Sequence, residues 1–124
     1  MDYRQLSPDT WAYLGDAVFE LLVRRYFVDK YGTKARDLHK RTTAVVNAEA
    51  QAQMLKRLEP YLSETESEVV RRGRNSAKRP GPKGVSVQEY RFSTGLEALF
   101  GYLYLQGDQE RLEELFRNGF GEEN

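Results

Sequence analysis

Helix start and stop signals recur along the whole chain, and they constrain its fold more than any other feature of the sequence. Serine, threonine, asparagine and aspartate caps alternate with glycine and proline stops, and two of the serines precede a glutamate by three residues, which makes a capping box. No segment alternates long enough between apolar and polar residues to predict a strand, apart from a weak hint at residues 85–87. The expected fold is therefore all-α.

The helical segments together account for one domain over residues 1–124. Their predicted caps are Ser7, Thr33, Asn47, Ser63, Ser86 and Asp108. We expect helices over residues 8–31, 34–46, 48–58, 64–73, 87–106 and 109–118. Between the fourth and fifth helices, a basic loop rich in glycine and proline is expected at about residues 73–86.

Composition excludes several classes of protein. The chain has no cysteine, which excludes disulfides and thiolate metal sites. Its N-terminus lacks the basic region and apolar run of a signal peptide, and no apolar stretch approaches the ~20 residues that cross a bilayer. The absence of cysteine fits a reducing cytoplasm without requiring it, and we expect no membrane partner.

The apolar helix WAYLGDAVFELLVRRY, residues 11–26, contains Asp16 directly after Gly15. A glycine in a helix interior costs about 1 kcal/mol relative to alanine. A carboxylate near a core costs more, unless it is paired, hydrogen-bonded or bound to a metal. Two unfavourable residues side by side indicate a candidate functional site.

The segment STGLEALFGYLYL, residues 93–105, repeats this pattern: Glu97 lies in an apolar helix between Gly95 and Gly101. Because glycines let two helix backbones approach closely, the pattern can bring Glu97 and Asp16 together. Two carboxylates held close together repel unless they share a proton or bind a divalent cation, and oxygen-only ligands favour Mg²⁺ or Mn²⁺. The alternative is that both acids are solvated residues on polar helix faces.

The formal net charge is zero, but the charges are unevenly distributed. Residues 71–83 contain six basic residues and no acidic one. Such a block can bind a polyanion even in a neutral protein, although a solvated loop is an equally good reading of the composition.

The two acidic motifs resemble those of the ribonuclease III family. LGDAVFELLVRRY is similar to the family's signature, and STGLEALFGYLYL resembles its second acidic segment. The resemblance spans residues 11–105 and implies a helical endonuclease domain in which Asp16 and Glu97 are the catalytic carboxylates and bind Mg²⁺, with Mn²⁺ as a possible substitute.

Two positions depart from the family pattern. Ala12 and Thr94 stand where the family usually has a glutamate and an aspartate, and the chain ends at Asn124 without room for the double-stranded-RNA-binding domain that normally follows. These departures, with the segments DLHKR, RRGRN and YRFSTGLEAL, resemble the Mini-III branch. That branch implies a cytoplasmic homodimer that cleaves double-stranded RNA and matures the ends of the large-subunit (23S) ribosomal RNA precursor.

Further roles follow from this resemblance. Tyr13 stands where the family has an aromatic at the dimer interface, although it could equally be a core residue of its own subunit. Glu20 could support the metal site from one turn away, but pairing with Arg24 on the surface is the preferred reading. Duplex RNA is recognised through its shape by basic and polar groups. The candidate RNA contacts are Arg71, Arg72, Arg74, Asn75, Lys78, Arg79 and Lys83 near the loop, with Lys40 and Arg41 in the second helix.

Two other functions are compatible with the sequence. A catalytically inactive module of the same fold could bind double-stranded RNA, because Ala12 and Thr94 replace two acids. A helical interaction protein could use its basic loop to bind acidic partners. Retention of both Asp16 and Glu97 favours the nuclease, since a pure RNA binder gains nothing from carboxylates that face a polyanion.

Overall fold

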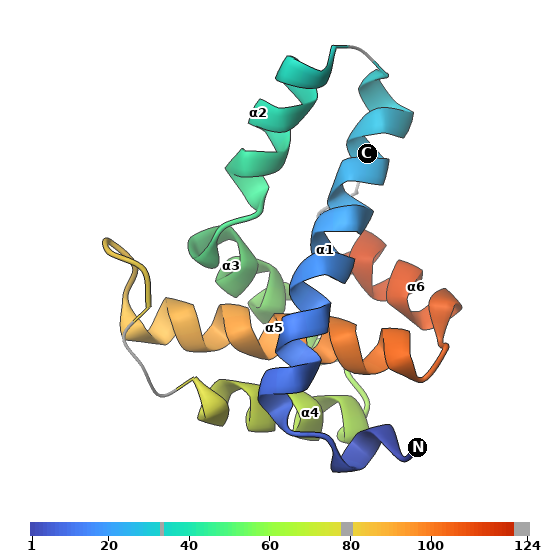
Figure 1. Ribbon diagram of the computed structural model, residues 1–124, viewed down its shortest axis with the longest axis vertical. Coiled ribbons are helices and arrows are strands. Elements are labelled where there is room, and N and C mark those ends of the chain that lie inside the picture. Colours follow the sequence, from blue (N-terminus) through green and yellow to red (C-terminus); the bar gives the residue numbers. More distant parts are fainter. Residues whose placement is uncertain (33, 78–80, 121–124) are drawn as a thin grey trace.

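Six α-helices and two short 3₁₀ turns form the fold, as the computed structural model shows for residues 1–32, 34–77 and 81–120 (Figure 1). The elements are η1 (Tyr3–Gln5), α1 (Pro8–Tyr31), α2 (Ala35–Val45), α3 (Ala48–Leu58), η2 (Glu59–Tyr61), α4 (Glu64–Ser76), α5 (Val87–Leu105) and α6 (Gln109–Gly119). The all-α prediction is confirmed. The hint of a strand at residues 85–87 is wrong, because Val87 begins α5 and the described residues contain no strand.

The predicted caps account for most helix starts. Ser7, Asn47 and Asp108 each accept a backbone hydrogen bond from the residue three positions on, and both capping boxes are formed. The predicted cap Thr33 lies outside the described residues, and Lys34 is the N-cap of α2. Local side-chain chemistry thus defines where the helices begin.

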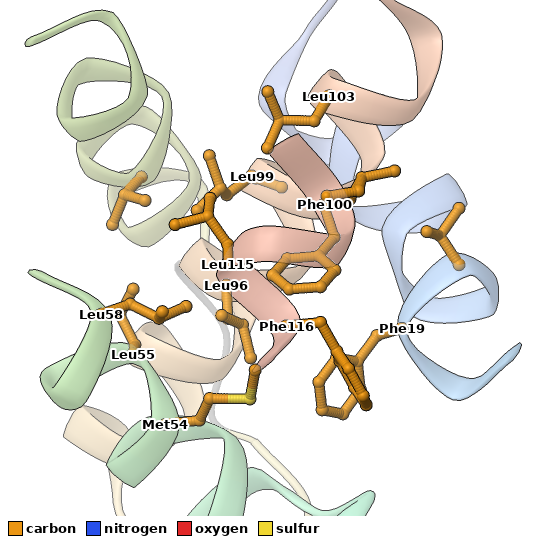
Figure 2. Close-up of a cluster of buried hydrophobic side chains, with 14 of the residues drawn as sticks. Phe19, Met54, Leu55, Leu58, Leu96, Leu99, Phe100, Leu103, Leu115 and Phe116 are labelled. Carbon is orange, nitrogen blue, oxygen red and sulfur yellow. The ribbon is translucent and has the colours of Figure 1, made fainter. Parts of the chain in front are cut away.

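Helix α5 is the centre of the fold, and α1, α3, α4 and α6 pack around it (Figure 1). It is buried on almost every side, as expected for a helix that is apolar around most of its circumference. Figure 2 shows the cluster around it, in which Leu96, Leu99 and Phe100 meet Phe19 of α1 and side chains of α3 and α6. Burial of this apolar surface is the main stabilising contribution.

Helices α1 and α5 cross at two glycines, Gly15 and Gly101. A Cβ atom at Gly15 would overlap the backbone carbonyl oxygen of Glu97, and one at Gly101 would overlap that of Trp11. The two backbones are therefore in direct contact, as the glycine pattern predicted. This crossing brings the acidic motif of α1 against the acidic motif of α5.

Helix α4 continues to Ser76 and does not end near Gly73, so that part of the prediction is wrong. Gly73 is buried against α5, where an added Cβ would lie 2.6 Å from the Cβ of Ala98. The glycine thus serves close packing between helices and does not terminate the helix.

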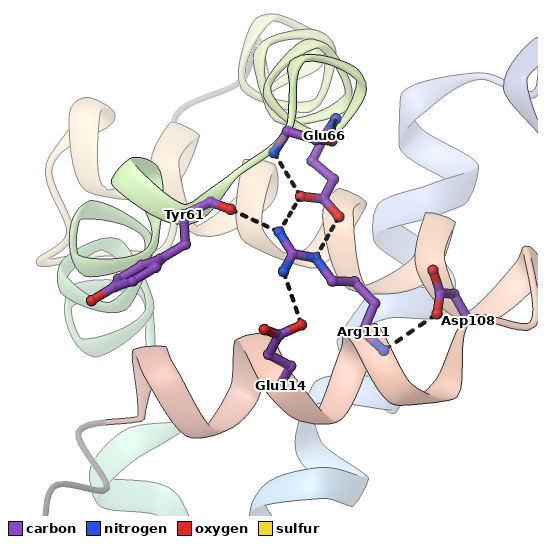
Figure 3. A network of polar contacts seen from close by, with 6 residues as sticks. Tyr61, Glu66, Asp108, Arg111 and Glu114 are labelled. Carbon is purple, nitrogen blue, oxygen red and sulfur yellow. Dashed lines mark hydrogen bonds and ion pairs between the residues drawn. The ribbon is translucent and has the colours of Figure 1, made fainter.

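Arg111 of α6 joins α6 to α4 and η2 (Figure 3). Its Nη2 and Nε donate to the two carboxylate oxygens of Glu66 at 2.7 and 2.8 Å, and its Nη2 also donates to the carbonyl oxygen of Tyr61. Burial disfavours the charged carboxylate, but the hydrogen bonds from Arg111 and the Ser63 N–H outweigh it and hold the pKa of Glu66 below its ordinary value. This bidentate pair stabilises the contact of α6 with α4.

Helix α2 projects from the rest of the fold beside the C-terminal half of α1 (Figure 1). Among the described helices, none combines the length and the apolar character needed to cross a membrane.

Gly15→Ala should destabilise the protein by about 1–3 kcal/mol or more, because the added methyl group meets backbone and not a movable side chain. The gain of about 1 kcal/mol in helix propensity is too small to offset this overlap. Urea denaturation measures the change. Ser67→Ala, at an exposed position of α4, is the control and should be nearly neutral; a Gly15→Ala protein as stable as the wild type would show that the crossing is not a constraint.

Candidate active site

Asp16 and Glu97 meet beside the glycine crossing, as predicted. Both side chains line a surface cleft of about 820 Å³ between α1 and the N-terminal half of α5. Asp16 is exposed at the cleft and Glu97 is partly buried beneath it. The structure thus unites two acids that are 81 positions apart in the sequence (97 − 16).

Burial and the neighbouring Asp16 both make the Glu97 carboxyl hard to ionise. Burial raises the pKa of Glu97, and the nearby charge of Asp16 raises it further, to about 8. A hydrogen bond from Gln51 opposes this shift but does not cancel it. Without a cation, Glu97 therefore holds its proton near neutral pH; a bound cation would favour the ionised form.

Gln51 of α3 is a site residue that the sequence analysis missed. Its Nε2 donates to Oε2 of Glu97 at 3.3 Å, and its side chain is buried. The signal in the sequence was a glutamine at helical spacing from Met54, Leu55 and Leu58, all of which are buried. A lone polar residue in an apolar stripe does not reveal its partner, so the contact with Glu97 needed the structure.

The two positions that depart from the family pattern also line the cleft. Ala12 and Thr94 lie beside the acid pair, and the Thr94 hydroxyl donates to the carbonyl oxygen of Tyr90. Within residues 1–32, 34–77 and 81–120, no three histidine, cysteine, aspartate or glutamate side chains are grouped closely enough to hold a metal ion. In the described part of the chain, the candidate metal site is thus the Asp16–Glu97 pair, with no third metal-ligating side chain grouped closely with it.

Two more residues line the same cleft. Glu20 accepts hydrogen bonds from Nε and Nη2 of Arg24 at 2.9 and 2.6 Å, which confirms the preferred reading of a surface ion pair. The side chain of Tyr13 is 83% exposed, so it is not a core residue of its own subunit.

Three arginines predicted to contact RNA are engaged within the protein. Arg71 pairs with Glu68, and Arg74 lies over the ring of Phe92. Arg72 lies over the ring of Trp11 and donates to the carbonyl oxygen of Arg4 at 3.2 Å. Arg72 thus joins α4 to the N-terminal region, and Arg74 joins α4 to α5. Binding RNA would require these three arginines to share or exchange partners.

The other predicted RNA contacts differ in their surroundings. Asn75, Lys83 and Lys40 are exposed and form no hydrogen bond or ion pair with another described side chain. Arg41 is exposed, and its guanidinium carbon lies 3.7 Å from the centre of the Tyr31 ring. Lys78 and Arg79 lie outside the described residues.

The Glu97 carboxyl should titrate with a pKa near 8 in metal-free protein, against an ordinary value of 4.5. Its stabilising contribution is then full below the unfolded pKa and is lost as the pH rises through about 8. Asp16→Asn should lower the midpoint because it removes the repelling charge, while burial keeps it above the ordinary value. Carbon-detected NMR of the side-chain carboxyl measures this. Glu20→Gln should leave the midpoint unchanged, and a wild-type midpoint near 4.5 would contradict the assignment.

The sequence of the chain is similar to those of known proteins. The ribonuclease III domain family matches residues 9–108. The chain is 49% identical to the Mini-ribonuclease 3 of Thermoanaerobacter sp. (strain X514) over 110 residues, which are 89% of this chain and 78% of that relative. It is 47% identical to the Mini-ribonuclease 3 of Symbiobacterium thermophilum over 112 residues, 90% of this chain and 86% of that relative.

The fold is also similar to a solved structure. A crystal structure of a protein from Fusobacterium nucleatum matches with a TM-score of 0.87 and 31% sequence identity, covering 99% of this chain and 98% of that one. The family match includes both acidic motifs, which are the residues that indicated the family from the sequence. The chain therefore belongs to the ribonuclease III family, in its Mini-III branch.

Proposed function

We propose that this member of the ribonuclease III family is a Mg²⁺-dependent endoribonuclease that cleaves double-stranded RNA, with Asp16 and Glu97 as its catalytic metal ligands. The observation that carries the proposal is the pairing of these two carboxylates in a surface cleft, where burial and mutual repulsion oppose ionisation of Glu97. Catalytic sites commonly contain such perturbed acids. The relatives named Mini-ribonuclease 3 support the same assignment.

The donor set fits a hard divalent cation. Carboxylate oxygens are the ligands that Mg²⁺ and Mn²⁺ accept readily, and Mg²⁺ usually keeps several waters when one or two carboxylates hold it. When bound, the cation would supply neutralisation of phosphate charge and an activated water nucleophile for phosphodiester hydrolysis. Water and phosphate oxygens would complete its coordination, since Ala12 and Thr94 cannot supply carboxylates.

The two acids reach the cleft from different helices. Asp16 approaches the cleft from the exposed face of α1, and Glu97 approaches it from the buried side on α5. The contact between the helix backbones at Gly15 and Gly101 holds the two carboxylates in register. Rigid helices therefore position both acids, which favours a pre-organised site.

We propose that duplex RNA lies across the basic residues of the α4–α5 loop and α2. Lys83, Asn75 and Lys40 are exposed and available, whereas Arg71, Arg72, Arg74 and Arg41 already contact other side chains. Lys78 and Arg79 remain part of this proposal on sequence grounds alone. The loop leads directly into α5, which carries Glu97, so a duplex held there would lie near the acid pair.

We also propose that the enzyme is a homodimer with Tyr13 at the interface. Tyr13 and Leu21 are 83% and 66% exposed on α1, and both line the cleft that contains the acid pair. One acid pair cuts one strand, so cleavage of both strands at a fixed stagger requires two sites related by a two-fold axis. Heterodimers of wild-type and Asp16→Asn chains should therefore nick one strand; a monomeric mass in light scattering would contradict the dimer.

We further propose that the substrate in the cell is the precursor of 23S ribosomal RNA. The resemblance to the Mini-III branch supports maturation of the ends of the 23S ribosomal RNA precursor, and that substrate would place the enzyme in the cytoplasm. Incubation with precursor RNA, followed by mapping of the new ends, tests this substrate directly.

Asp16→Asn should keep the fold and lower cleavage of duplex RNA by at least about 100-fold, because outer-shell partners of a metal alone contribute roughly 10–100-fold. Glu97→Gln should behave likewise. The measurement is cleavage of structured and single-stranded RNA with and without Mg²⁺. Asp29→Asn, at an exposed position farther along α1, is the matched control and should cleave normally.

The same assay distinguishes the proposed endoribonuclease from the alternative function. Duplex binding without Mg²⁺-dependent cleavage by the wild-type protein would favour a catalytically inactive RNA-binding module. Full cleavage by purified Asp16→Asn protein would remove Asp16 from the active site.

Combined Lys40→Ala and Lys83→Ala should weaken duplex binding and flatten its salt dependence. On the calibration for B-DNA, the log–log slope should change by about 0.9 for each phosphate that is no longer neutralised. The rate at saturating RNA should fall much less, because these lysines would bind ground and transition states alike. The control is Arg117→Ala, a substitution that deletes an exposed positive charge on α6. An unchanged slope in the double variant would show that neither lysine contacts phosphate.

A further inference from the structure

Gln51 occupies a place where the core would ordinarily hold an apolar side chain. It is 4% exposed and belongs to the buried stripe of α3 that continues through Met54, Leu55 and Leu58. A buried polar group is costly unless it is hydrogen-bonded, so an amide at this position needs a partner. The partner is Oε2 of Glu97, 3.3 Å from Nε2 of Gln51.

This contact joins α3 to the acidic motif of α5. Helix α3 packs against α5, and Gln51 reaches Glu97 across that interface. Asp16 approaches Glu97 from a different helix, α1. Glu97 thus lies between the Gln51 amide, which donates to it, and the Asp16 carboxylate, whose charge opposes its ionisation.

The amide is chemically suited to orient a metal ligand. A donor on one oxygen restricts rotation of the carboxyl group and leaves its other lone pairs available to a cation. An arginine or lysine in this place would bring a positive charge and compete with the cation, whereas a neutral amide does not. Outer-shell hydrogen bonds to ligating carboxylates act in this way in metal sites generally.

We propose that Gln51 is a positioning residue of the active site, which orients the Glu97 carboxylate for the divalent cation. The inference rests on the proposed function, because it assigns Glu97 as a metal ligand. It goes beyond that function by adding a residue from a third helix, so the site draws on α1, α3 and α5.

The test is Gln51→Met, which removes the donor and keeps a similar unbranched volume. The Mn²⁺ affinity of this variant, measured by electron paramagnetic resonance, should fall roughly 10- to 100-fold. The kcat for duplex RNA should fall while KM stays within about twofold, because the change affects the metal site and not the RNA surface. In a Glu97→Gln background, Gln51→Met should cause no further decrease in Mn²⁺ affinity, since the pair acts as one unit.

Gln53→Met is the matched control: it changes the same residue type at an exposed position of α3 and should leave Mn²⁺ affinity and kcat unchanged. Unchanged Mn²⁺ affinity and kcat in Gln51→Met would overturn the positioning role and leave the proposed function intact. A wild-type protein that neither binds Mn²⁺ nor cleaves duplex RNA would overturn both.

A measurement on the wild-type chain covers the case in which Gln51→Met does not fold. The side-chain amide signals of Gln51 in a ¹H–¹⁵N spectrum should shift on addition of Mg²⁺, whereas those of Gln53 should not. Absence of a shift at Gln51, at Mg²⁺ concentrations that support cleavage, would contradict the inference.

Discussion

The contact between the backbones of α1 and α5 is the constraint on which the rest of the structure depends. At Gly15 and Gly101 no side chain separates the two helices, so their axes approach as closely as backbone atoms permit. This approach brings Asp16 next to Glu97, and it lets α5 lie at the centre of the other helices. One local feature, a glycine in each helix, therefore determines both the packing and the position of the acids.

The acid pair shows how stability and function oppose each other here. Glu97 would be easier to accommodate as an apolar residue, because burial and the neighbouring charge of Asp16 both disfavour its ionised form. The core of α5 and the Arg111–Glu66 pair stabilise the fold elsewhere. A divalent cation would remove the repulsion, so metal binding and stability should be coupled in this protein.

Features that depend on neighbouring residues could be predicted from the sequence, and features that depend on distant ones could not. The capping boxes at Ser63 and Ser86 are local, and both were predicted correctly. The extension of α4 beyond Gly73 was missed because that glycine packs against Ala98 of another helix. The partners of Arg72 and Arg74 were missed as well: a block of six positive charges indicated a polyanion surface, but these two guanidinium groups lie over aromatic rings on other helices.

The same division applies to the candidate site. The glycine–acid pattern predicted that Asp16 and Glu97 would meet, because each motif carried the anomaly in its own residues. Gln51 carried only a weak signal, a polar residue in an apolar stripe, and its contact with Glu97 depends on how α3 packs on α5. The exposure of Tyr13 likewise required the arrangement of the helices around α1.

We expect a divalent cation to bind between Asp16 and Glu97. This binding site can be tested with a crystal structure of the Mn²⁺-loaded protein, in which anomalous difference density is recorded at the manganese edge. We expect a peak bonded to a carboxylate oxygen of each residue, with waters in the remaining coordination positions. A peak at another site, or none between these two acids in crystals of protein that cleaves RNA with Mn²⁺, would contradict it.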